Sequence, residues 1–218
     1  MAKKVISILR TRGYRINVRR KKLSVNNKDY EVLIHVVRSK AKPTAVFMPD
    51  YVSPHRPYPV FVYIFAIAIY ELAPKTTQRL AAEITRKTFG LGANNFSAST
   101  LCRTRKKLIE SGASIIDALK NGANGGIADN VQPETPEEFE ELINEGAAGI
   151  ADIYGRQHSL PGTGTPDIKE VLAAFPGLAE FISKTIMGDA QPYDKASFAA
   201  LAGMACRKYY LWNRRLII

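Results

Sequence analysis

The sequence predicts an α+β fold that is mainly helical, with a small basic β unit at the N-terminus. Three observations predict this class. Apolar and polar residues alternate only near the N-terminus, between residues 14 and 37, as in half-buried strands. From residue 59 onward, apolar residues recur at the three- and four-residue spacing of helices. The 218 residues are 46% apolar and 23% charged, which is typical of a globular chain.

The strand pattern comes first along the chain. Residues 14–18 predict one short strand, and residues 23–25 and 30–37 predict two more around a turn at Asn26 and Asn27. Cations crowd the same stretch, where they could hold phosphates or protect an exposed strand edge from pairing with other chains. The candidate phosphate contacts in this unit are Arg12, Arg15, Arg19, Arg20, Lys21 and Lys22.

A proline-rich segment follows the strands. Residues 42–59 contain five prolines and predict an extended connector, with Phe47, Tyr51 and Tyr58 among the side chains that pin it to a helical core. We therefore take residues 1–58 as one part, a basic β unit with its connector.

The next part, residues 59–120, is expected to contain a helix-turn-helix-like core of three helices, followed by a further helix around residues 114–120. Pro59 suits a first helical position, and residues 60–73 are apolar on almost every face, which predicts a buried central helix. Thr76 or Thr77 can cap a second helix that ends near Thr88. The glycine-rich turn before the third helix is longer than the three or four residues usual in a helix-turn-helix, so a looser three-helix arrangement stays open.

The third helix, expected over residues 97–110, is the candidate reader of nucleic acid. Serines at its start can cap it, and Leu101, Leu108 and Ile109 form one apolar stripe. Its charges could equally be the solvated face of an ordinary helical bundle. In the DNA-reading interpretation, Ser99, Thr100 and Arg103 lie nearest the bases in the major groove, and Arg105, Lys106 and Lys107 lie on phosphates.

The remaining part, residues 121–218, reads as an acidic helical domain with a basic aromatic tail. A glycine- and asparagine-rich run at 121–126 marks its start, and glutamates cluster over 137–145 at an expected helix start, where a metal site is not needed to explain them. Further helices are expected over 167–175, 177–187 and from 194 to about 211. The apolar face of the last helix should contain Phe198, Leu201, Met204 and Ala205.

These features together resemble a known family. The segment 47–58, Phe-Met-Pro-Asp-Tyr-Val-Ser-Pro-His-Arg-Pro-Tyr, and the helix pattern Ser97-x-Ser99-Thr100-Leu101-x-Arg103 resemble bacterial mobile-element proteins that join an N-terminal zinc ribbon to a transposase-type helix-turn-helix. The resemblance covers residues 14–112 and implies DNA binding. The paired cysteines of that ribbon are missing here, and His35 and His55 alone cannot form a tetrahedral site, so we expect no metal.

The charge distribution also favours a polyanionic partner. The net charge is +11 and the isoelectric point is near 9.7. Residues 1–42 carry thirteen lysines and arginines against two acids, whereas residues 114–206 have a net charge of −9. The nucleic-acid surface should therefore lie in the first half of the chain. We expect a DNA-binding protein of mobile-element or regulatory type that acts on double-stranded DNA; a homodimer would suit a palindromic site.

Two other classes of function stay open. One is a basic module that recognises RNA or assembles with an acidic protein partner. The other is a metal-dependent nuclease or transposase remnant, although the acidic residues fall on expected helices and loops and not on a sheet that could hold two metals. No nucleophile elbow, zinc-protease motif or phosphate loop is found, so the sequence favours a non-enzymatic protein without a cofactor.

The last expectations concern the cell compartment. Cys102 and Cys206 lie far apart in sequence, which predicts buried, reduced thiols and a cytoplasmic or nucleoid-associated protein. The apolar run at 60–70 is too short to span a membrane.

Overall fold

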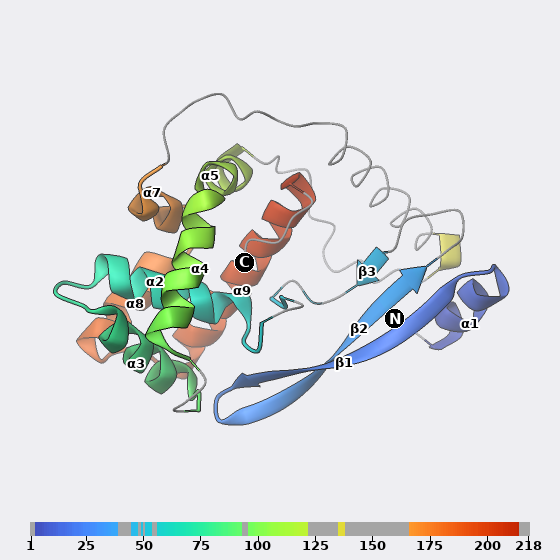
Figure 1. Cartoon of the computed structure of the whole chain (residues 1–218), viewed down its shortest axis with the longest axis horizontal. Coiled ribbons are helices and arrows are strands. Elements are labelled where there is room, and N and C mark those ends of the chain that lie inside the picture. Colours follow the sequence, from blue (N-terminus) through green and yellow to red (C-terminus); the bar gives the residue numbers. More distant parts are fainter. Residues whose placement is uncertain are drawn as a thin grey trace. The chain divides into compact units, whose positions relative to one another are not determined.

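The computed structural model describes residues 3–38, 45–47, 49, 51–53, 56–92, 96–121, 135–137 and 166–213 (Figure 1). It confirms the mainly helical α+β class. Two compact units are present, and both are discontinuous in sequence. The sheet unit contains Met1–Lys21, Glu31–Met48 and Ala123–Pro161, and the helical unit contains Lys22–Tyr30, Pro49–Gly122 and Gly162–Ile218. Residues 1–58 are therefore shared between the two units, in contrast to the predicted boundary at residue 58.

The sheet has three strands in the order β1 (Arg15–Val25), β2 (Lys28–Arg38) and β3 (Ala45–Phe47). Strands β2 and β3 are antiparallel, with His35 opposite Phe47. Asn26 and Asn27 both have φ 55°, the left-handed backbone of a two-residue hairpin turn. The predicted turn is thus confirmed.

Strand β1 differs from the prediction because it is one continuous strand of 11 residues. It buries Ile16 and Leu23, which are an odd number of residues apart and so lie on opposite faces of the strand. A single alternating pattern cannot describe such a strand. Helix α1 (Lys3–Thr11), whose Leu9 is buried, was not predicted from the sequence.

The helical unit is built around helix α2 (Val60–Leu72), which has no polar face and buries the consecutive residues 62–69. Such a helix must be covered on every side. Helices from both halves of the chain do this: α3 (Gln78–Phe89), α4 (Ala98–Glu110), α7 (Ile168–Ala173), α8 (Leu178–Met187) and α9 (Pro192–Asn213) all contact α2 (Figure 1).

Aromatic side chains show that this is one core. The ring centroids of Phe65 and Phe181 are 5.2 Å apart, and those of Phe181 and Phe198 are 5.1 Å apart. Helix α5 (Gly112–Asn121) belongs to the same core through Ile115 and Ala118. Residues 166–213 therefore share the core of α2–α5, and the described part of 121–218 does not form a separate domain.

Local capping signals place the helix ends close to their expected positions. Thr77 caps α3 by accepting the amide hydrogen of Leu80 at 3.2 Å, and Ser97 caps α4 in the same way from Thr100. Helix α2 begins one residue later than expected, because Pro59 has an extended backbone and is the N-cap.

Two expectations about burial are wrong. Met204 is 54% exposed, because α9 turns Phe198, Ala202 and Ala205 toward the core instead. Cys102 is exposed, since it lies beside the apolar stripe of α4 and not within it, whereas Cys206 is buried as expected.

The tip of the β1–β2 hairpin belongs to the helical unit and docks on the end of α3. The amide of Asn26 donates to the carbonyl of Phe89 at 2.6 Å, and the amide of Asn27 donates to that of Gly90 at 2.8 Å. Lys195 of α9 closes this contact by donating to Asn26 Oδ1 at 2.7 Å and to the carbonyl of Thr88 at 3.1 Å. Backbone and side-chain hydrogen bonds thus hold the turn against the helices.

Candidate nucleic-acid interface

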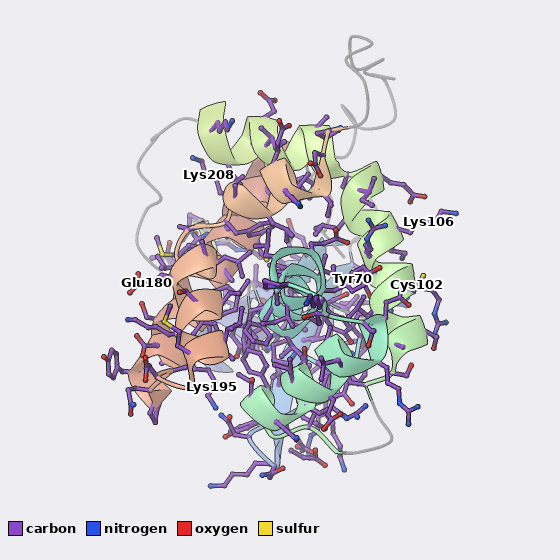
Figure 2. All side chains as sticks on the ribbon, turned by 90° about the vertical axis from the view of Figure 1, so that its left-hand side faces the viewer. Tyr70, Cys102, Lys106, Glu180, Lys195 and Lys208 are labelled. Atoms are coloured by element: carbon purple, nitrogen blue, oxygen red, sulfur yellow. The ribbon has the colours of Figure 1, made fainter. Side chains whose placement is uncertain are left out.

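Helix α4 has one buried and one exposed side. Leu101, Thr104 and Leu108 have no exposed surface, and they occupy positions one turn apart on the side that faces the core. The exposed side carries Ser99, Cys102, Arg103, Lys106 and Lys107. Figure 2 shows Cys102 and Lys106 extending outward from α4, whereas Tyr70 lies among the packed side chains. The predicted reader helix therefore presents a polar, basic surface to solvent.

Hydroxyl groups cluster at the start of this helix. The Oγ of Ser97 lies 2.9 Å from the Oγ of Ser99 and 3.1 Å from the Oγ1 of Thr100, while it also caps the helix. Ser99 is exposed and Thr100 is half-buried. Of the two hydroxyl residues predicted to lie nearest bases, Ser99 is the one fully on the outer side.

The cations on α4 are not equivalent. Arg103 donates from Nε to the carbonyl of Ser99 at 3.3 Å, and its side chain is exposed. Lys106 is 81% exposed, and its Nζ lies 4.0 Å from Glu110, at the limit of an ion pair. Lys107 is exposed in the last turn of the helix. These three side chains supply the accessible positive charge of α4.

Arg105 differs from them because it points toward α2. Its Nε forms a short ion pair with Glu71, and its guanidinium lies 5.9 Å from the ring centroid of Tyr70. The hydrogen bond to Glu71 raises the pKa of Arg105 above its ordinary value. The structure therefore gives Arg105 a neutralising carboxylate partner and a place between two helices, which does not favour the phosphate contact expected from sequence.

The connection between α3 and α4 is long for a helix-turn-helix, as the sequence indicated, and residues 93–95 lie outside the described part. Arg86 of α3 spans it by donating from Nη1 to the carbonyl of Phe96 at 2.9 Å, immediately before α4. The ring of Phe96 packs against Tyr58 and Tyr63, at centroid distances of 5.8 and 5.6 Å. These contacts fix the start of α4 without a short turn.

The six N-terminal candidates have different surroundings. Arg15, Arg19 and Lys22 are exposed on β1, and Arg20 lies 3.6 Å from Glu31 on β2. Lys21 is half-buried, and burial lowers its pKa. Lys22 belongs to the helical unit and the others to the sheet unit.

Arg12 has a partner that is distant in sequence. Its Nη2 lies 2.6 Å from Oε1 of Glu137, and this hydrogen bond lowers the pKa of the Glu137 carboxyl group. Arg12 is thus an N-terminal candidate that already contacts an anion. The other glutamates of the 137–145 cluster lie outside the described residues.

Metal chemistry finds no support in the described ranges, which contain no group of three or more His, Cys, Asp or Glu side chains placed to hold an ion. His35 is half-buried on β2, and burial lowers its pKa. His55 lies outside the described residues. Among the described helices, none is long and apolar enough to cross a membrane.

Comparisons with protein-family models, with curated protein sequences and with solved structures found no match.

Proposed function

We propose that this protein binds duplex DNA and that the exposed side of α4 enters the major groove. The observation that carries the proposal is the division of α4 into a fully buried apolar side and an exposed side with Ser99, Arg103, Lys106 and Lys107. An α-helix with this arrangement fits the major groove, where arginine and serine contact base edges and lysine contacts phosphates.

The packing around α4 supports this proposal. Helices α2, α3 and α4 contact one another in the pairs required of a helix-turn-helix-like unit. The ion pair between Glu71 and Arg105 joins α4 to α2 beside the buried side of α4, with the side chain of Arg105 33% exposed. A helix held in this way has a fixed backbone orientation, so its outer residues face solvent together as one surface for a groove.

The exposed cations of β1 supply a second source of positive charge. Arg15, Arg19 and Lys22 have exposed side chains, and no carboxylate of the described residues is within ion-pair distance of them. In our proposal they contact the phosphate backbone without reading sequence. The sequence resembles mobile-element proteins with a transposase-type helix-turn-helix, and a protein of mobile-element or regulatory type would bind DNA in this way.

The test is fluorescence-anisotropy binding to labelled duplex DNA, single-stranded DNA and structured RNA over a salt series. We expect tighter binding to duplex DNA and a logarithmic salt slope of about −0.9 for each phosphate contacted. Lys106→Ala and Lys107→Ala should each weaken binding to all duplex sequences and reduce the slope by about 1.

Lys169→Ala is the matched control, because Lys169 is also an exposed lysine but lies on α7. It removes the same charge and should leave the slope nearly unchanged. Preference for RNA, or equal effects of all three lysine substitutions, would contradict the α4 interface and favour a basic RNA-binding or assembly module.

A further inference from the structure

We infer that α4 recognises a guanine base in the major groove through the guanidinium group of Arg103. This inference rests on the proposed function and goes further by naming the base and the side chain. Arg103 stands on the exposed side, in the second turn of α4, between the hydroxyls at its start and the lysines near its end.

Among the described residues, no hydrogen bond or ion pair occupies the two terminal amino groups of Arg103, so they can bind a ligand. Its Nε is tied to the carbonyl of Ser99, one turn earlier, at 3.3 Å. This bond directs the side chain over the first turn, and it uses the donor that a two-pronged contact does not need. The described residues place no carboxylate within ion-pair distance of Arg103. The guanidinium group is therefore partly ordered before DNA binds.

Guanine is the base whose hydrogen-bond acceptors match the two terminal amino groups of arginine. It presents two acceptors, O6 and N7, side by side in the major groove, whereas adenine presents one acceptor and one donor. Arginine has donors only, so it is complementary to guanine and meets a repulsive donor on adenine. A lysine such as Lys106 offers one compact ammonium group and discriminates less.

Arg105 shows why the assignment falls on one arginine of the helix. Its guanidinium is bound to Glu71 and faces Tyr70, with 33% of its side chain exposed. Arg103 and Arg105 are two residues apart, so they point to different sides of a helix. Fixing Arg105 inward on α2 holds Arg103 outward.

The experiment begins with selection of binding sites from a random duplex library by the full chain. Each guanine enriched in the selected site is then replaced by 7-deazaguanine, which removes the N7 acceptor and keeps the Watson–Crick pairing. At one guanine we expect the wild-type protein to lose about fivefold or more in affinity, roughly half the discrimination of a bidentate contact. Arg103→Ala should bind the natural and the modified site equally.

Two controls separate a base contact from a general loss. Lys106→Ala should bind more weakly but keep the full response to 7-deazaguanine. Arg103→Lys keeps the positive charge and a helix-forming side chain, and it should lose most of the guanine preference at that position. Circular dichroism checks that each variant is folded, which we expect because Arg103 is exposed.

The outcomes distinguish this inference from the proposed function. A wild-type protein that binds duplex DNA and selects a sequence, but responds to no 7-deazaguanine, overturns the role of Arg103 alone. That role is equally overturned if Arg103→Ala still responds to the modified base. A wild-type protein with no preference for duplex DNA overturns the proposed function and this inference together.

Discussion

Replacing Gly90 with alanine should destabilise the helical unit by about 2–4 kcal/mol, because a β-carbon there meets the docked hairpin tip. Gly90 has φ +54°, and an alanine in that left-handed backbone costs about 1 kcal/mol. Its Cβ would lie 2.9 Å from the amide nitrogen of Asn27 and 3.0 Å from the Cα of Asn26. These are backbone atoms, so the turn must move and weaken its two hydrogen bonds to the end of α3, each worth about 1 kcal/mol.

The matched control is Gly188→Ala. Gly188 also ends a helix, α8, in the left-handed conformation with φ +82°, but a Cβ there meets nothing within 4 Å. It should therefore cost only the backbone contribution of about 1 kcal/mol. Urea unfolding followed by circular dichroism at 222 nm measures both variants against the wild type. Equal losses for Gly90→Ala and Gly188→Ala would refute the docking of the hairpin tip.

Three further substitutions test contacts within the helical unit. Lys195→Ala should lower the free energy of unfolding by about 1–2 kcal/mol, because it removes two hydrogen bonds at the hairpin tip; no change in a urea titration would argue against this contact. Tyr63→Phe should be neutral or stabilising by about 1 kcal/mol, since the buried hydroxyl has no hydrogen-bond partner among the described residues. Burial raises the pKa of Tyr63 to about 12, so its hydroxyl ionises first in the unfolded chain, and this residue alone should lower the stability by about 1.4 kcal/mol per pH unit from pH 10 to 12. Unfolding curves over that range should lose this contribution in Tyr63→Phe, and an unchanged slope would contradict it. Glu71→Leu should cost about 1–2 kcal/mol, an amount limited by the partial exposure of Arg105, and the pair Glu71→Leu with Arg105→Met should recover most of it. Thermal unfolding of the single and double variants tests this prediction. A double variant no more stable than Glu71→Leu would show that the unpaired charge of Arg105 is not the cause of the loss.

Local signals in the sequence were sufficient for much of the secondary structure. The caps at Thr77 and Ser97, the hairpin turn at Asn26 and Asn27, and the apolar helix after Pro59 are all present. Each depends on residues only a few positions apart, where backbone preference and side-chain capping act directly. The sequence also predicted the side of α4 that carries accessible cations, because Leu101 and Leu108 mark the opposite side.

Contacts between residues far apart in sequence could not be predicted in the same way. A run of cations looks identical whether it is solvated or paired, and only the fold brings Glu71, 34 residues before it, to Arg105. Helical periodicity likewise predicted an apolar face for α9 but not which residues it turns inward, because that depends on the helices α2, α5 and α8 against which α9 packs. Met204 is exposed for this reason, and Ala202 is buried.

The sequence by itself determined the mainly helical class, the starts of α3 and α4 and the basic character of α4, since these depend on composition and neighbouring residues. The tertiary structure alone decided that the C-terminal helices complete the core of α2, and that the hairpin tip docks on α3 and Lys195. The physical reason is that an all-apolar helix must be covered from every side, and the sequence does not say which helices will cover it.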